Sequence, residues 1–148
     1  MILTGDAIRQ AILDRAIEFE PFADEKLNPN SIDLHLGDAI AEVVVVGDGA
    51  EPAYQPLTPE GLLLTPGCLY LARSRECFGS NRFAPMVHGK SNIARAGMFV
   101  HVNGELVDVG VVNHFEFQLV PMLPIRVRPG MAIAQVTFWA IAHEISHP

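Results

Sequence analysis

Seven residues near the middle of the chain combine chemical groups that suit an anion. The run from Gly89 to Arg95 holds a glycine, the cations Lys90 and Arg95, a hydroxyl and an amide. Main-chain N–H groups beside the glycine and both cations can face one phosphate, so the run predicts a phosphate contact. It is not a Walker A loop, because that motif needs a glycine where Ala84 stands. A polar surface loop ahead of a strand is the alternative.

Composition limits the class of protein. The chain has 148 residues, 49% of them hydrophobic and 18% charged, which predicts one domain over residues 1–148 with a core of its own. The net charge of −7 argues against a nucleic-acid surface, although a small basic pocket for a nucleotide remains possible. No apolar run is long enough to cross a membrane, and the start does not resemble a signal peptide. Cys68 and Cys77 have no metal or disulfide spacing, so we expect a reduced, cytoplasmic protein.

Alternating hydrophobicity predicts many short strands after a single N-terminal helix at residues 4–16. A turn at 103–105 and a long loop at 47–61 separate some of the strands. Because no long helix alternates with the strands, a doubly wound nucleotide fold is excluded, and a β-barrel or jelly roll is favoured. The expected strands are 17–22, 32–37, 41–46, 62–64, 68–74, 83–87, 99–102, 106–107, 111–120, 123–127 and 133–141.

Five segments, taken in order, resemble the dCTP deaminase and dUTPase family. They are Asn28–Gly37, Gly89–Gly97, His101-Val102, Val107-Asp108 and Arg128–Met131 with Ala134-Gln135. The start Ile2-Leu3-Thr4-Gly5-Asp6 and Pro21-Phe22 look like the deaminase branch. Each segment alone is weak evidence for the family, whereas the order and spacing of all five together are specific to it.

The resemblance implies a distorted β-barrel of the dUTPase-like β-clip type, assembled as a homotrimer with active sites shared between subunits. It implies a deoxypyrimidine nucleotide as ligand, with Mg²⁺ bound through the triphosphate. The activity it implies is deamination of dCTP to dUTP without zinc, hydrolysis of dUTP to dUMP, or both. The zinc deaminases carry His-x-Glu and Pro-Cys-x-x-Cys, and we expect neither motif in this chain.

Matching the family's motifs assigns roles to individual residues. Ser91 and Arg95 match residues that reach a neighbouring subunit's site, where Ser91 orients water or phosphate and Arg95 positions the base. Asp108 matches the aspartate that contacts the sugar and, in dUTPases, helps to activate water. The remaining matches are to substrate contacts: Lys90, Asn92 and Gln135 near the phosphates, and Asn103 with Gly104 at the pyrimidine edge.

The general base is a choice between two residues. When the chain is matched to the family without gaps and counted back from Pro129, the position of the catalytic glutamate falls on Glu116. When the same count runs forward from Asp108, it falls on Gln118. We prefer Glu116, because the backward match is longer and the turn after Asp108 absorbs a deletion easily. The two residues are two positions apart and therefore share a strand face. Glutamine at this position would prevent deamination, because it cannot accept a proton from water.

A further expectation concerns the C-terminus. Family members cover the triphosphate with a segment rich in Gly and in Lys, Arg or Gln, and residues 142–148 do not have this composition. We therefore keep a non-catalytic nucleotide-binding protein as an alternative to the deaminase and to the dUTP diphosphatase.

Overall fold

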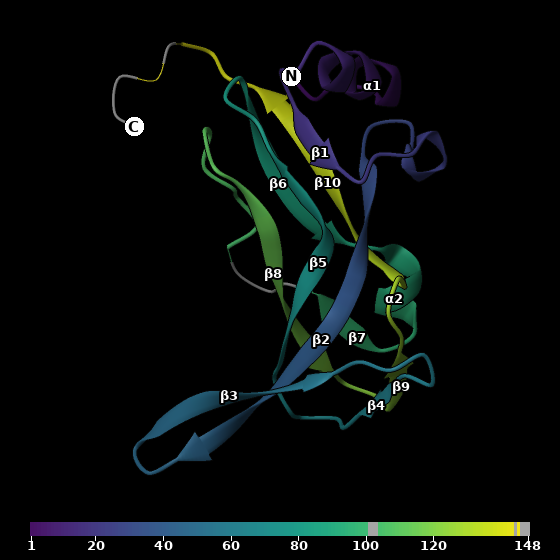
Figure 1. Ribbon diagram of the computed structural model, residues 1–148, viewed down its shortest axis with the longest axis vertical. Coiled ribbons are helices and arrows are strands. Elements are labelled where there is room, and N and C mark those ends of the chain that lie inside the picture. Colours follow the sequence, from purple (N-terminus) through teal and green to yellow (C-terminus); the bar gives the residue numbers. More distant parts are fainter. Residues whose placement is uncertain (101–103, 144, 146–148) are drawn as a thin grey trace.

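Short antiparallel strands and one N-terminal helix form the chain (Figure 1). The computed structural model describes residues 1–100, 104–143 and 145. The prediction of a mainly β chain is confirmed. No described helix is long and apolar enough to span a membrane. In chain order the elements are α1 (Gly5–Leu13), β1 (Glu18–Glu20), η1 (Asp24–Lys26), β2 (Ile32–Val46), β3 (Gly49–Pro56), β4 (Leu62–Leu64), β5 (Tyr70–Gly79), β6 (Phe83–Gly89), α2 (Ser91–Arg95), β7 (Met98–Val100), β8 (Val112–Pro121), β9 (Ile125–Val127) and β10 (Ala132–Ala140).

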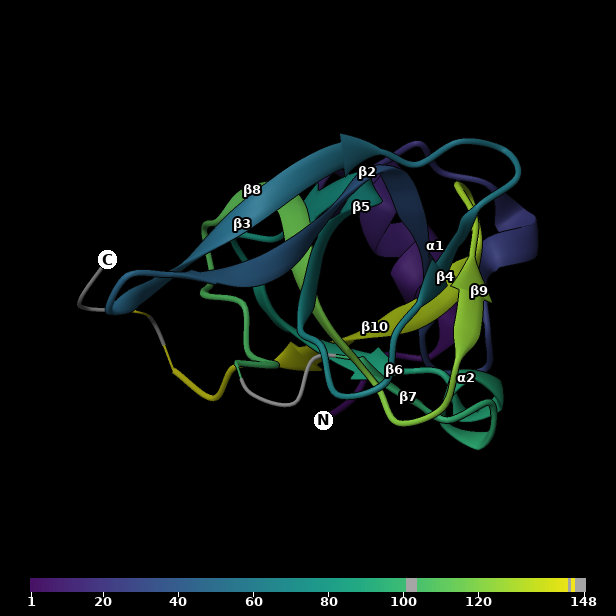
Figure 2. The same ribbon diagram turned by 90° about the horizontal axis from the view of Figure 1, so that it is seen from below.

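One large sheet curls around the apolar core, as the view from below in Figure 2 shows. Its strands follow the order β6-β10-β2-β5-β8-β7, with β1 added on β5 and β3 added on β2, while β4 and β9 form a separate pair. Along β5, alternate side chains from Tyr70 to Phe78 are buried, and Arg73 and Arg75 between them are exposed. The side chains that point inward from the strands therefore form the core, and those that point outward are exposed to solvent.

Helix α1 packs on the core through Ile8 and Ala11. Thr4 caps it as predicted, because its hydroxyl accepts a hydrogen bond from the main chain of Ala7 at 3.3 Å. The helix ends at Leu13, three residues before the predicted end at residue 16. Just beyond this end, Arg15 takes a left-handed backbone conformation with φ of 57°.

The prediction of a loop at residues 47–61 is wrong over most of that segment, because residues 49–56 form strand β3. Strand β2 continues through Gly37, and β3 pairs with its second half from Ala39↔Pro56 to Val46↔Gly49. The two form a hairpin that projects from the barrel (Figure 1), and every side chain of β3 is exposed. The prolines within this segment suggested a loop, but an edge strand tolerates proline where no partner needs its N–H.

A second difference lies in the central stretch, where residues 91–95 form the short helix α2 rather than a loop. The strand predicted at 99–102 is seen as β7 from Met98 to Val100. The remainder of that strand and most of the turn predicted at 103–105 fall on residues 101–103, outside the described residues.

A buried carboxylate joins three elements at the upper part of the barrel. Glu76 of β5 has no exposed side-chain surface, and its Oε1 accepts hydrogen bonds from Lys26 Nζ at 2.9 Å and His35 Nδ1 at 2.7 Å. Its Oε2 accepts the main-chain N–H of His35 at 2.8 Å. The carboxylate thus links η1, β2 and β5, and both oxygens are satisfied although no water reaches them.

Substituting Glu76→Gln keeps the side-chain volume but leaves the mostly buried Lys26 without its counter-charge. We expect the free energy of unfolding to fall by about 3 kcal/mol, because removing one partner of a buried ion pair leaves the other uncompensated. Urea denaturation measures this loss. The control Glu51→Gln, on exposed β3, should change stability by less than about 0.5 kcal/mol. Equal small effects for both variants would refute the role given to Glu76.

Candidate active site

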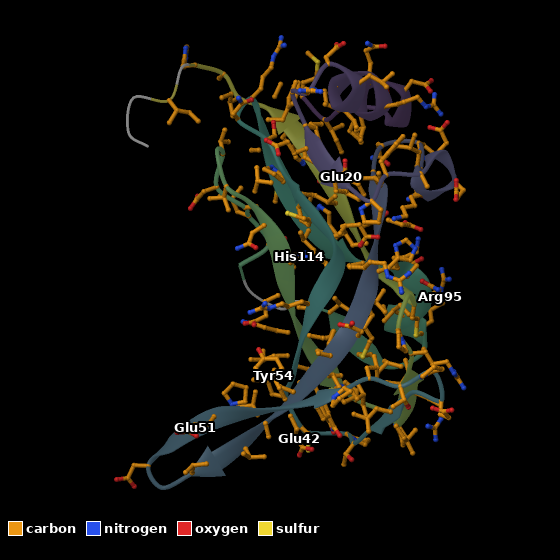
Figure 3. All side chains as sticks on the ribbon, viewed as in Figure 1. Glu20, Glu42, Glu51, Tyr54, Arg95 and His114 are labelled. Atoms are coloured by element: carbon orange, nitrogen blue, oxygen red, sulfur yellow. The ribbon has the colours of Figure 1, made fainter. Side chains whose placement is uncertain are left out.

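The residues that the sequence selects fall into two groups on opposite flanks of the chain. Ser91, Asn92 and Arg95 lie on α2, whereas Glu116 lies on β8. Figures 1 and 2 both show α2 and β8 on different sides of the barrel, and Figure 3 shows Arg95 far from His114 of β8. One copy of the chain therefore does not bring the two groups together.

Helix α2 presents its polar side chains to solvent. Ile93 is 2% exposed and anchors the helix in the core, while Ser91, Asn92 and Arg95 are exposed. Among the described residues none of these three side chains forms a hydrogen bond or ion pair. A hydroxyl, an amide and a guanidinium are therefore available on one small surface.

Two further predicted contacts are engaged within the chain. Lys90 Nζ lies 2.6 Å from Asp33 Oδ1, which also accepts a hydrogen bond from Asn28 Nδ2 at 2.7 Å. Gln135 Oε1 accepts a hydrogen bond from Ser31 at 2.7 Å. The first of these bonds ties the start of α2 to β2, and the bond of Gln135 ties β10 to the residue before β2.

Glu116 and Gln118 share the outward face of β8, as predicted. Glu116 pairs across the sheet with Arg73, and Gln118 pairs with Leu71. Only Glu116 lines a cavity of about 270 Å³, which it shares with Leu106, Val107 and Val111. This carboxylate therefore lies beside an open hollow whose walls are mostly apolar.

A tyrosine from the projecting hairpin reaches Glu116. The hydroxyl of Tyr54, near the base of β3 (Figure 3), donates a hydrogen bond of 3.1 Å to Glu116 Oε2. Loss of hydration around the phenol, followed by the bond to the carboxylate, raises the pKa of Tyr54 above its usual value. The phenol thus stays protonated at neutral pH. Its stabilising bond is complete below the unfolded pKa of about 10 and is lost as pH rises through the folded value.

The loop before β8 forms the other side of the Glu116 cavity. Met86 of β6 forms an isolated bridge with Leu106, and the main chain of Val107 donates to Pro85. Asp108 is exposed, and its carbonyl accepts a hydrogen bond from Val111 in a turn. Gly104 is described with a φ of 77°, whereas Asn103 lies outside the described residues.

Sequence reasoning missed Tyr54, Arg73 and His114, which surround Glu116. Tyr54 fell in the supposed loop, and strand pairing alone places the other two. The expectation about zinc motifs also needs a correction, since His114-Phe115-Glu116 does have the His-x-Glu spacing. Both cysteines are free, and no three potential metal ligands cluster in the part of the chain that the structure describes.

Known proteins resemble this chain over nearly its whole length. The family model described as dCTP deaminase-like matches residues 2–141. A protein named dCTP deaminase, dUMP-forming, from Hathewaya histolytica is 35% identical over 148 residues, covering 97% of this chain and 86% of that relative. A dCTP deaminase from Rhodopirellula baltica is 34% identical over 146 residues, covering 96% of this chain and 73% of the relative.

Solved structures agree on the fold. The crystal structure of 2'-deoxycytidine 5'-triphosphate deaminase from Agrobacterium tumefaciens has a TM-score of 0.76 and 23% identity, covering 93% of this chain. This chain spans 47% of that protein, about half its length. The resemblance stated from the sequence is therefore confirmed, and the chain belongs to the dCTP deaminase-like family, whose named members are enzymes.

Proposed function

We propose that this protein deaminates dCTP without zinc, at sites shared between copies of the chain. The observation that carries the proposal is the placement of Glu116, which lines an apolar-walled cavity and accepts a hydrogen bond from Tyr54. The relatives named dCTP deaminase support the choice of substrate. Two free cysteines, Cys68 and Cys77, suit a reducing compartment, and we propose a cytoplasmic location.

Glu116 would act as general base and then as general acid. It takes a proton from a water molecule that attacks C4 of cytosine, and it returns the proton to the amino group as the C4–N bond breaks. The products are dUTP and ammonia, so atoms and charge balance without an oxidant or reductant.

The α2 side chains would complete this site from a neighbouring copy. Ser91 and Arg95 are exposed and unpaired within the described chain, yet their helix α2 lies on the other side of the barrel from β8, which carries Glu116 (Figures 1 and 2). Exposed apolar side chains adjoin α2, namely Phe99, Met122 and Leu123, with exposed fractions of 55%, 58% and 57%. Such a surface suits a subunit contact. A heterologous contact repeated around a three-fold axis gives a closed trimer in which α2 of one copy faces β8 of the next.

The remaining predicted contacts would hold the nucleotide. Asn92 and Lys90 would approach the phosphates, with Gln135 behind them. Asp108 would contact the sugar, and Asn103 with Gly104 would face the pyrimidine edge. Magnesium would arrive with the triphosphate and neutralise part of its charge, and we assign it no ligand from the chain.

A second candidate activity is diphosphate release that yields dUMP. The name of the Hathewaya histolytica relative, which includes the words dUMP-forming, favours it. The exposed carboxylate of Asp108, next to the Glu116 cavity, is the group that could activate water for this second step.

The direct test is incubation of the protein with dCTP and Mg²⁺, followed by chromatography of the nucleotides and an ammonia assay. Release of ammonia with dUTP supports deamination, and release of ammonia with dUMP supports both activities. Unchanged dCTP and unchanged dUTP in parallel samples would overturn the proposal in favour of a nucleotide-binding protein.

Replacing Glu116→Gln should reduce ammonia release at least about 100-fold, since general base catalysis contributes 10²- to 10⁴-fold. The matched control is Gln118→Ala, which changes the neighbouring residue on the same face and should retain activity within about threefold. A strong loss in the control, with activity kept in Glu116→Gln, would move the catalytic position to residue 118.

Replacing Tyr54→Phe removes only the hydroxyl that holds Glu116. We expect kcat for dCTP to fall about tenfold, because the variant loses one hydrogen bond to a charged group. KM should stay within about twofold. In a spectrophotometric alkaline titration, Glu116→Gln should lower the pKa of Tyr54, because the negative acceptor is gone. An unchanged kcat in Tyr54→Phe would show that the bond does not position the base.

A further inference from the structure

A second hollow adjoins the Glu116 cavity on the outer face of β5 and β8. Its volume is about 420 Å³, and His114 lines both spaces. Arg73 and Arg75 reach it from β5, and Gly37 and Asp38 border it from β2. Two cations and a histidine thus meet in one concave place on a protein of net charge −7.

Glu116 lies opposite Arg73 across the sheet, whereas no acidic residue is paired in register with Arg75. The two arginines are exposed, alternate with buried residues of β5, and point to the same face. Within the described residues, neither Arg73 nor Arg75 forms an ion pair or a side-chain hydrogen bond. In the lining of this hollow two guanidinium groups face one carboxylate, that of Asp38.

The surrounding backbone holds these groups in place. A Cβ added to Gly130 would lie 3.1–3.3 Å from the guanidinium of Arg75, so this group packs directly over the glycine. The ring of His114 is fixed by a 3.0 Å bond between Nδ1 and the carbonyl of Ser74. Because a carbonyl only accepts, Nδ1 carries a proton. Nε2 donates to a phosphate oxygen when it is protonated as well, and it accepts from a phosphate hydroxyl group when it is not.

We propose that Arg73, Arg75 and His114 form a phosphate-binding subsite. Guanidinium groups bind phosphate oxygens through paired N–H donors, and packing on Gly130 orients one of them beforehand. The phosphate comes either from the tail of a nucleotide or from a free phosphate ion. The subsite is separate from α2, and its existence does not depend on deamination.

The test follows the ring signals of His114 by NMR, at constant ionic strength, while inorganic phosphate or dCTP is added. The His114→Asn variant identifies the signals, and His88 of β6 serves as an internal reference. We expect a saturable shift of the His114 signals with at least one ligand. The double variant Arg73→Gln, Arg75→Gln should weaken that binding at least tenfold.

Two further variants sharpen the result. Arg126→Gln, on β9, removes one charge elsewhere and should leave the shift unchanged. Arg75→Lys keeps the charge without the planar group and should weaken binding by less than the double variant does. Glu116→Gln protein is used with dCTP, so that turnover does not change the ligand.

The outcomes separate the two sources of phosphate. A shift with inorganic phosphate identifies a free anion site. A shift with dCTP alone, together with a KM for dCTP that rises about tenfold in the double variant, identifies the nucleotide's own phosphate. No shift with either ligand, or a shift that persists in the double variant, overturns the proposal whether or not the protein deaminates dCTP.

Discussion

The carboxylate of Glu76 is the interaction on which the geometry of this barrel depends. Regular pairing is interrupted on both sides of it, between Leu36 and Ile40 of β2 and between Arg73 and Cys77 of β5. Such irregularities bend strands and redirect side chains. Glu76 holds the bend to η1 and β2, and Ser74 satisfies the released backbone by donating to the Glu76 carbonyl and accepting from Phe115 N–H.

Much of the fold could be predicted from alternating hydrophobicity, because the buried rows of β8 and β10 are mostly apolar. The β2–β3 hairpin could not. Its side chains are exposed on β3, so no alternation marks that strand, and its prolines and glycines are those of a loop. Only the pairing with residues 39–46 makes it a strand. Helix α2 was hidden for a similar reason, since five residues with one buried side chain carry no helical period.

The candidate site shows the same division. The resemblance to the family suggested Glu116, Ser91, Arg95 and Asp108, and their spacing showed that residues 116 and 118 share a face. The sequence could not show that Lys90 is paired with Asp33, nor that Tyr54 contacts Glu116, because these contacts join residues 57 and 62 positions apart. The separation of α2 from β8 is likewise a property of the fold. In the function proposed above, the two groups are half-sites, and a second copy of the chain would complete each of them.

The central claim is that one copy's Arg95 serves the next copy's Glu116. It is tested by mixing the Arg95→Ala and Glu116→Gln proteins under conditions that exchange subunits, and measuring ammonia release from dCTP. Each variant alone should be inactive. In an equal mixture of trimers, about one quarter of the sites would pair an intact Glu116 with an intact neighbouring Arg95, so about a quarter of the unmodified activity should return. A mixture as inactive as its components, after subunit exchange has been verified, would contradict the shared site.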